Sequence, residues 1–234
     1  MYIDFHTHII PRFDDGAKDV DMSLAMLRTA RKSGAKKVIL TPHYSTRADI
    51  GEFFCLREKR VNELKAAMQE NPDDYPEILV GAEAALDGSL TDVDDISPLL
   101  IEGTDLLLLE LPYTSWSSWY NNGIYDIIVK HNVTPIMAHI ERYLDSPKDV
   151  EKLSTLASFG VKFQVNAPSF LSHSGKKIIK TLAEKGLISA IGSDCHNLDT
   201  RSPDIEKAMA QIDKKLGRGF CDFVYERTQE LLNK

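Results

Sequence analysis

Short apolar runs alternate with amphipathic segments along nearly the whole chain. Several of the runs are apolar throughout, which is typical of parallel strands that are covered on both faces. Strands are expected at residues 2–5, 37–41, 78–81, 106–109, 134–138, 162–165 and 188–191. Segments with apolar residues at helical spacing lie between these runs or follow the last of them, at residues 21–33, 52–70, 116–131, 147–159, 175–184, 203–216 and 220–232.

The regular alternation of strand and helix predicts an α/β fold. Gly34, Gly160 and Gly186 stand at or near the ends of helical segments, where a residue with left-handed backbone often terminates a helix. The sequence shows no internal repeat and no linker-like segment. We therefore expect a closed or nearly closed barrel of about seven strand and helix units, in a single domain that spans residues 1–234.

Composition narrows the class of protein. With 234 residues, 43% of them hydrophobic and 27% charged, the chain is long enough to bury a large core without help from a metal. A net charge of −7 argues against nucleic-acid binding. Neither a membrane-spanning run nor a signal-peptide pattern is found, and the three scattered cysteines are typical of reduced thiols, so a cytoplasmic protein is expected. The oligomeric state is not predicted.

Residues of metal-ligand type stand just beyond most of the predicted strands. Because the carboxyl ends of parallel strands open on one face of a barrel, these side chains should converge there. Five histidines and four carboxylates are too many for one structural ion, and they predict a polynuclear catalytic metal centre. The residues are His6, His8, Asp15, His43, Glu83, Glu110, His139, Asp194 and His196.

The prediction depends on the joint pattern and not on any one motif. His6 and His8 alternate on one face of an extended segment, so both imidazoles can reach one ion, but an isolated HxH pair is a weak signal. The strand-end positions of the other residues supply the stronger argument. His131 and His173 fall outside the pattern and are given structural roles.

The segments HTH, DDG, TPH, GAE, LEL, AHIER and SDxHN extend from His6 to the neighbourhood of Arg201. In these segments the chain resembles the polymerase and histidinol phosphatase superfamily, whose members are metal-dependent phosphoesterases on a distorted (β/α)7 barrel. It is more similar still to the bacterial branch of manganese-dependent tyrosine-protein phosphatases that controls capsule and exopolysaccharide synthesis. The resemblance covers nearly the full chain.

The resemblance implies three ions and a ligand set for each. The sets are His6, His8, Glu83 and Asp194; then Glu83, as a bridge, with Glu110 and His139; and then Asp15, His43 and His196. Relatives elsewhere in the superfamily often have histidine at the positions of Asp15 and Glu110. Additional carboxylates favour harder ions, so manganese is expected, with zinc, iron or mixed occupancy as alternatives.

The implied reaction is attack on phosphorus by a hydroxide that bridges two ions. Arg142 and Arg201 match the family's phosphate-clamping arginines, and a planar guanidinium can bind two phosphoryl oxygens at once. A further group of residues follows strand ends and either frames a tyrosyl ring or packs within the loops. This group contains Tyr44, Arg47, Tyr113, Trp116 and Trp119.

The sequence also bears on several other functions. Cys195 and Arg201 fit the CxxxxxR signature of cysteine-dependent phosphatases, but the residues between them contain no glycine, and Asp199 would repel phosphate. A non-catalytic regulatory module would be expected to lack ligands, and none of the nine is missing. The acidic composition disfavours a phosphodiesterase or nuclease. A small-molecule phosphatase of the histidinol phosphatase type remains the main alternative, whereas the resemblance implies a phosphotyrosyl substrate, the tail of a bacterial tyrosine kinase.

Overall fold

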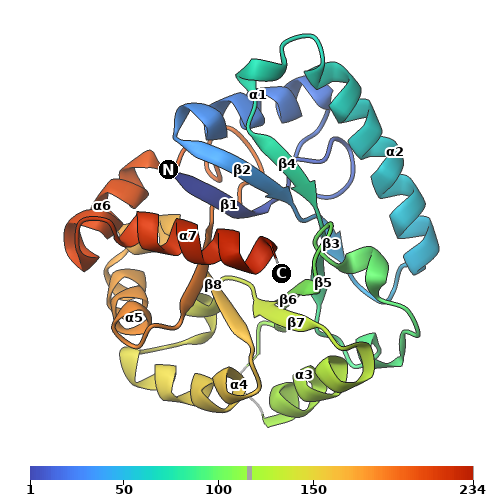
Figure 1. Cartoon of the computed structure of the whole chain (residues 1–234). Coiled ribbons are helices and arrows are strands. Elements are labelled where there is room, and N and C mark those ends of the chain that lie inside the picture. Colours follow the sequence, from blue (N-terminus) through green and yellow to red (C-terminus); the bar gives the residue numbers. More distant parts are fainter. Residues whose placement is uncertain (115–117, 234) are drawn as a thin grey trace.

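Parallel β-strands form the centre of the molecule and helices surround them (Figure 1). The computed structural model describes residues 1–114 and 118–233. Its strands are β1 (Tyr2–Thr7), β2 (Ala35–Leu40), β3 (His43–Tyr44), β4 (Glu77–Val80), β5 (Glu83–Ala85), β6 (Leu106–Glu110), β7 (Thr134–Met137), β8 (Lys162–Asn166) and β9 (Ile188–Gly192). Every predicted strand is found, and the predicted α/β fold with parallel strands is confirmed.

Two of the predicted strands are bent and continue into a second segment. β2 is followed after two residues by β3, and β4 is followed after two residues by β5. The first segments belong to a sheet of order β1-β2-β4, and the second segments belong to a sheet of order β3-β5-β6-β7-β8-β9. The bends were not predicted from the sequence. They turn His43 and Glu83, which are paired in register on β3 and β5, toward the same end of the strands.

The first and last strands lie side by side at their carboxyl ends. Thr7 forms a parallel bridge with Cys195, the His8 amide donates to the Cys195 carbonyl at 3.0 Å, and the Asp194 amide donates to the His6 carbonyl at 2.8 Å. These hydrogen bonds bring the segment after β1 against the segment after β9. Residues almost two hundred positions apart in the sequence thereby share one site.

The α-helices are α1 (Val20–Lys32), α2 (Ile50–Met68), α3 (Ser118–His131), α4 (Ser154–Ser158), α5 (His173–Glu184), α6 (Glu206–Leu216) and α7 (Phe220–Leu232). The 3-10 helices are Pro72–Asp74, Leu90–Asp92, Ser97–Leu99, Ile140–Tyr143, Pro147–Leu153 and Ala167–Leu171. The helix predicted over residues 147–159 is therefore mostly a 3-10 helix, with α4 as its last turn. The helix predicted from residue 203 begins only at Glu206. Among helices of the described residues, none is long and apolar enough to cross a membrane.

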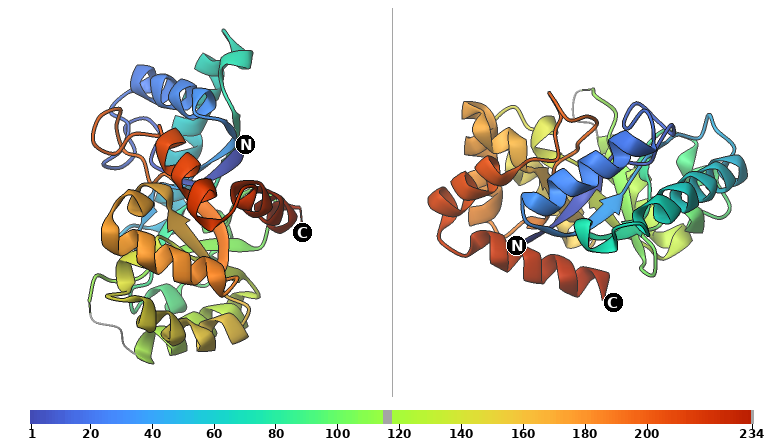
Figure 2. Two further views of the ribbon diagram at one scale, coloured as in Figure 1. Left: turned by 90° about the vertical axis from the view of Figure 1, so that its left-hand side faces the viewer. Right: turned by 90° about the horizontal axis from the view of Figure 1, so that it is seen from above.

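The apolar residues form two clusters that fix the strands in place. The larger cluster lies between the strands and the surrounding helices. The smaller one, which includes Ile3, Phe5, Leu108 and Ile136, is contributed mainly by strands, and Leu231 of α7 packs into it. Figure 2 shows α7 on the side of the strands opposite the loops that follow β1 and β9. Consequently one end of the strand assembly is covered by α7, and the polar site occupies the other end.

Candidate metal centre

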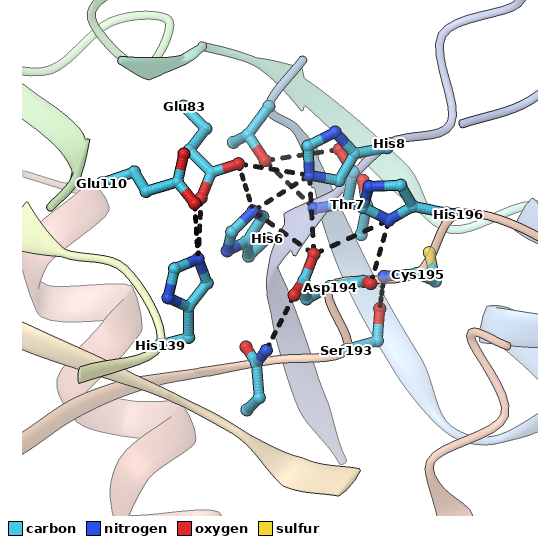
Figure 3. A network of polar contacts seen from close by, with 12 residues as sticks. His6, Thr7, His8, Glu83, Glu110, His139, Ser193, Asp194, Cys195 and His196 are labelled. Atoms are coloured by element: carbon cyan, nitrogen blue, oxygen red, sulfur yellow. Dashed lines mark hydrogen bonds and ion pairs between the residues drawn. The ribbon is translucent and has the colours of Figure 1, made fainter. Parts of the chain in front are cut away.

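The nine predicted ligand residues come together at the carboxyl ends of the strands, and most of them are seen in Figure 3. Their ligand atoms form overlapping groups within which all atoms lie within 4.8 Å of one another. The groups are His8, Asp15, His43 and His196; His6, His8 and Asp194; His6, Glu83 and His139; and His43, Glu83 and Glu110. Among the residues that the structure describes, neither His131 nor His173 belongs to any of these ligand groups.

Glu83 connects the two sides of this cluster. Its side chain is 1% exposed, and one carboxylate oxygen, Oε2, lies 3.1 Å from His6 Nε2, 3.4 Å from His8 Nε2 and 2.9 Å from His43 Nδ1. The other oxygen, Oε1, lies 2.9 Å from His139 Nε2 (Figure 3). A single buried carboxylate thus contacts four imidazoles, as a ligand shared between ions would.

The surrounding charges shift the pKa values of this group strongly. Burial by itself would raise the pKa of Glu83, but the charge of His6 and hydrogen bonds from His139 and His43 outweigh it and hold that pKa well below its usual value. For His6 the directions are reversed: burial by itself would lower the pKa, whereas the charges of Glu83 and Asp194 raise it to about 9. The site therefore favours cationic groups next to its carboxylates.

The DDG segment contributes both of its aspartates, in different ways. Asp15, the predicted ligand, is 65% exposed, and its Oδ1 lies 3.2 Å from His196 Nε2 and 3.6 Å from His43 Nε2. Asp14 was not predicted. Its Oδ2 lies 2.7 Å from His8 Nδ1, so it orients the other ring nitrogen of His8 toward the cluster. The presence of a second aspartate next to Asp15 was the sequence signal that could have indicated the role of Asp14.

Arg142 and Arg201 both contact the same carboxylate. An Nη2 of Arg142 lies 2.5 Å from Asp194 Oδ2, and an Nη2 of Arg201 lies 2.6 Å from Asp194 Oδ1. The loop after β9 folds back because the His196 and Asn197 amides both donate to the Arg201 carbonyl, at 2.9 and 3.1 Å. This closure places the Arg201 guanidinium beside Asp194, although Arg201 comes seven positions later in the sequence.

Two cavities meet at these arginines. The first, of about 470 Å³, is lined by His43, Glu83, Glu110, Tyr113, His139 and Asp194 in addition to the two arginines. The second, of about 600 Å³, shares Arg142, Asp194 and Arg201 with the first and extends between the 3-10 helix Ala167–Leu171 and the segment that leads into α6. A molecule whose phosphoryl group lay at the arginines could therefore place its remaining atoms in the second cavity.

Of the candidate ring-framing residues, Tyr113 is the one that lines the first cavity. It is 64% exposed, accepts a hydrogen bond from Arg142 Nη1 at 3.1 Å, and its ring stacks on His139 with centroids 6.2 Å apart. Tyr44 is buried and packs against Phe53. Arg47 and Trp119 line neither of the two cavities, and Trp116 lies outside the described residues.

The chemistry of the donor set fits divalent cations. His139 Nδ1 is a buried polar atom without a hydrogen-bond partner among the described residues. Such atoms are costly to bury unless another group satisfies them. Imidazole nitrogens combined with carboxylate oxygens are a donor set that suits manganese, zinc or iron.

A comparison of the sequence with known families identifies the family of this chain. The family described as "Capsular polysaccharide synthesis, CpsB/CapC" has a sequence model that matches residues 2–233. The chain belongs to the CpsB/CapC family. The branch predicted from the sequence segments is thereby confirmed.

Two named proteins are similar to this chain over nearly its full length. Tyrosine-protein phosphatase YwqE of Bacillus subtilis is 29% identical over 235 residues, which cover 98% of this chain and 91% of the relative. Tyrosine-protein phosphatase CpsB of Streptococcus pneumoniae is 26% identical over 227 residues, which cover 92% and 91% of the two chains.

Solved structures show the same relationship. One structure, from work on YwqE of Bacillus subtilis and CpsB of Streptococcus pneumoniae described as "unique metal-dependent tyrosine phosphatases", superposes with a TM-score of 0.79 at 26% identity, covering 99% of this chain and 94% of the other. A putative histidinol phosphatase from Listeria monocytogenes has a TM-score of 0.54 at 16% identity, over 83% of this chain and 95% of the other, and shows a shared fold.

Cys195 does not have the properties of a catalytic thiol in this CpsB/CapC chain. It is fully buried, and its backbone amide donates a hydrogen bond to Ser193 Oγ at 3.2 Å. Burial raises the pKa of its thiol well above the usual value. A nucleophilic cysteine requires the opposite shift, toward the thiolate. The CxxxxxR pattern is therefore coincidental in this structure.

Proposed function

We propose that this chain is a metal-dependent protein-tyrosine phosphatase that acts in capsular or exopolysaccharide synthesis. The observation that carries the proposal is the convergence of five histidines and four carboxylates, Glu83 among them, beside two arginines at the junction of two cavities. Membership of a family whose relatives are named tyrosine-protein phosphatases supports the same activity.

The residues have separable tasks in this proposal. The nine histidine and carboxylate side chains would hold the cations, with Glu83 shared between ions, and three ions with manganese favoured is the occupancy that we propose. When bound, the cations would supply Lewis-acid activation of water and would neutralise charge on the phosphoryl group. Arg142 and Arg201 bind the phosphoryl oxygens of the substrate. Their guanidinium groups, which contact the carboxylate of Asp194 in the structure, turn to these oxygens when the substrate binds. Their planar donors orient the phosphorus for in-line attack.

The leaving group fits a site without a dedicated general acid. A tyrosyl phenolate has a conjugate acid with a pKa near 10, so it departs with less protonation than an alkoxide requires. Tyr113 lies at the edge of the first cavity, where its exposed ring can contact the ring of the substrate. We infer that Tyr113 helps to select an aryl phosphate.

A protein substrate is favoured over a small metabolite by the second cavity. Its volume of about 600 Å³ begins at the arginines and continues past Leu171 and Ile205, which leaves room for residues that flank a phosphotyrosine. The substrate that we propose is the tyrosine-containing tail of a bacterial kinase. We further propose that residues 1–234 form one domain with a distorted (β/α)7 barrel, which the hydrogen bonds between the segments after β1 and β9 support.

A kinetic comparison tests the proposed activity. We expect kcat/KM for a phosphotyrosyl peptide to exceed that for histidinol phosphate by about a hundredfold or more, because the pocket provides ring and chain contacts that the metabolite cannot use. Treatment with a chelator should abolish hydrolysis, and Mn²⁺ should restore it. A preference for histidinol phosphate would overturn the substrate assignment, and activity that a chelator leaves unchanged would overturn the metal-dependent mechanism.

Replacement of Cys195 separates the metal mechanism from the cysteine mechanism. The Cys195→Ser variant is expected to keep most of its phosphotyrosine hydrolysis, because the buried thiol contacts no cavity at the arginines. Steady-state kinetics with and without chelator provide the measurement. Cys221→Ser, at a second buried cysteine on α7, is the matched control for the packing change. Loss of activity in the Cys195 variant alone, with indifference to chelator, would contradict the expected mechanism.

A further inference from the structure

Strand β8 contributes no predicted ligand, yet two of its polar side chains lie beneath the metal centre. Gln164 is fully buried and Asn166 is 2% exposed, and both are on the part of β8 that approaches the cluster. Buried amides are costly unless their donors and acceptors are satisfied. Their contacts lead directly to residues of the proposed centre.

The hydrogen bonds of these amides form one continuous chain. Gln164 Oε1 accepts from the His139 backbone amide at 2.7 Å and lies 3.3 Å from His6 Nδ1. Gln164 Nε2 donates to Asn166 Oδ1 at 2.8 Å. Asn166 Nδ2 in turn donates to Asp194 Oδ2 at 2.9 Å. Three residues of the proposed centre, on three different strand ends, are thus connected through β8.

The direction of this chain is fixed by the backbone. A backbone N–H can only donate, so the group of Gln164 that faces His139 must be the carbonyl oxygen. That oxygen has no hydrogen, and therefore His6 must donate to it from Nδ1. The nitrogen of Gln164 then faces Asn166 Oδ1, which leaves the Asn166 amino group to donate to the Asp194 carboxylate.

This polarity suits metal ligation by His6. With the proton on Nδ1, the lone pair of Nε2 points into the cluster, where Glu83 Oε2 lies 3.1 Å away and His8 Nε2 lies 3.1 Å away. His8 is oriented in the same way by the carboxylate of Asp14. The two histidines of the HTH segment are therefore held by different partners, an amide for His6 and a carboxylate for His8.

The same chain steadies two strained backbone positions. His139 has φ of 32° and Asp194 has φ of 54°, both in the left-handed region that non-glycine residues seldom occupy. One is held through its backbone amide and the other through its side chain. Close packing completes the arrangement, because a Cβ added at Gly192 would lie 2.7 Å from His6 Cβ and 2.8 Å from Gln164 Nε2.

We propose that Gln164 and Asn166 are positioning residues that orient His6, His139 and Asp194 for cation binding. The proposal rests on the proposed metal-dependent function, since it assigns these amides a role only toward the ligands of that centre. Asn166 also lines the second cavity, so the positioning role is tested by cation binding and not by activity. The hydrogen bonds of the two amides hold the three ligand side chains in place before a cation binds. Cation binding then costs less conformational entropy.

The test is a Mn²⁺ affinity measurement on the full chain, by competition with a chelating dye. Gln164→Met keeps the length of the side chain and removes its acceptor, so the dissociation constant should rise by about 10- to 100-fold, as is typical for loss of a residue that orients a ligand. Thr228→Val is the matched control, because it removes buried hydrogen bonds from α7 to the Ser189 carbonyl on β9 and to the Val224 carbonyl on α7 itself. The control should bind Mn²⁺ like the wild type.

A spectroscopic readout distinguishes orientation from packing. In the Zn²⁺-loaded wild type, the His6 Nδ1–H proton should be protected from exchange with solvent. In Gln164→Met its NMR signal should shift, and the proton should exchange faster. Asn166→Leu provides a second variant, in which the affinity for Mn²⁺ should fall while this signal remains as in the wild type.

The outcomes separate this proposal from the proposed function. If wild-type protein bound neither Mn²⁺ nor Zn²⁺, the metal-dependent function itself would fail. If wild-type protein bound the cations and Gln164→Met bound them equally well, with an unchanged His6 signal, only the positioning role would be overturned. Should Gln164→Met fail to fold, Asn166→Leu decides the question, because unchanged Mn²⁺ affinity in that variant contradicts the proposed role.

Discussion

Replacement of Glu83 by glutamine is expected to lower kcat/KM for a phosphotyrosyl peptide by roughly a thousandfold, because it removes a buried charge that belongs to two of the ligand groups. The substitution keeps the shape of the side chain. It removes a negative charge that lies within hydrogen-bonding distance of His6, His43 and His139. A neutral amide is a much weaker ligand than a carboxylate, and it cannot bridge two cations in the same way.

The measurement combines metal content with kinetics. Glu83→Gln should retain fewer ions per chain after dialysis against Mn²⁺, and the loss of activity should not be recovered by moderate excess of the metal. Glu77→Gln on β4 is a suitable control, since Glu77 is exposed and pairs with Lys37 at 2.9 Å, away from the cluster. Full metal content together with wild-type kcat/KM in the Glu83 variant would remove Glu83 from the centre of the mechanism.

The strand ends explain why so much of the cluster could be predicted from the sequence. His43, Glu83 and His139 each follow an apolar run, and parallel strands place such positions at one end of the sheet. Once the runs were recognised as strands, convergence of the ligand residues followed from topology. The bends between β2 and β3 and between β4 and β5 were not predictable in this way, because they depend on which sheet each segment joins.

The residues that orient the ligands were missed for a different physical reason. Asp14 has the correct chemistry but stands next to a residue of the same type, and sequence alone did not show which aspartate faces His8. Gln164 and Asn166 carry amides, which give no metal-ligand signal, and they lie within a strand. Their importance arises from burial and from the direction of hydrogen bonds, which only the folded structure reveals.

The division of ligands among ions is a third property that depends on three-dimensional detail. The resemblance implies that His8 shares an ion with His6, Glu83 and Asp194. In the structure His8 is within reach of two groups, one with His6 and Asp194 and one with Asp15, His43 and His196. Since the atoms of neighbouring groups overlap, the ligand set of each ion stays a prediction that metal-bound structures can test.

Replacement of Arg142 or Arg201 by alanine is expected to lower kcat/KM by about a hundredfold each, because each removes a charged, directional donor for the phosphoryl oxygens. Lysine at either position should recover only part of the loss, since an ammonium group lacks the planar pair of donors. The double variant should lose less than the product of the single losses, because both guanidinium groups contact the same carboxylate and act on one phosphoryl group.

The choice of substrates shows whether these arginines bind phosphate or the surrounding peptide. If they bind the phosphoryl group, hydrolysis of p-nitrophenyl phosphate should fall as much as hydrolysis of a phosphotyrosyl peptide, while bound Mn²⁺ stays at the wild-type level. Lys207 lines the second cavity but not the first, so Lys207→Ala should affect only the peptide. Unchanged p-nitrophenyl phosphate hydrolysis in both arginine variants would contradict a phosphate-binding role. Such a result would leave Arg142 and Arg201 as partners of Asp194, with their charge serving to hold that carboxylate in place.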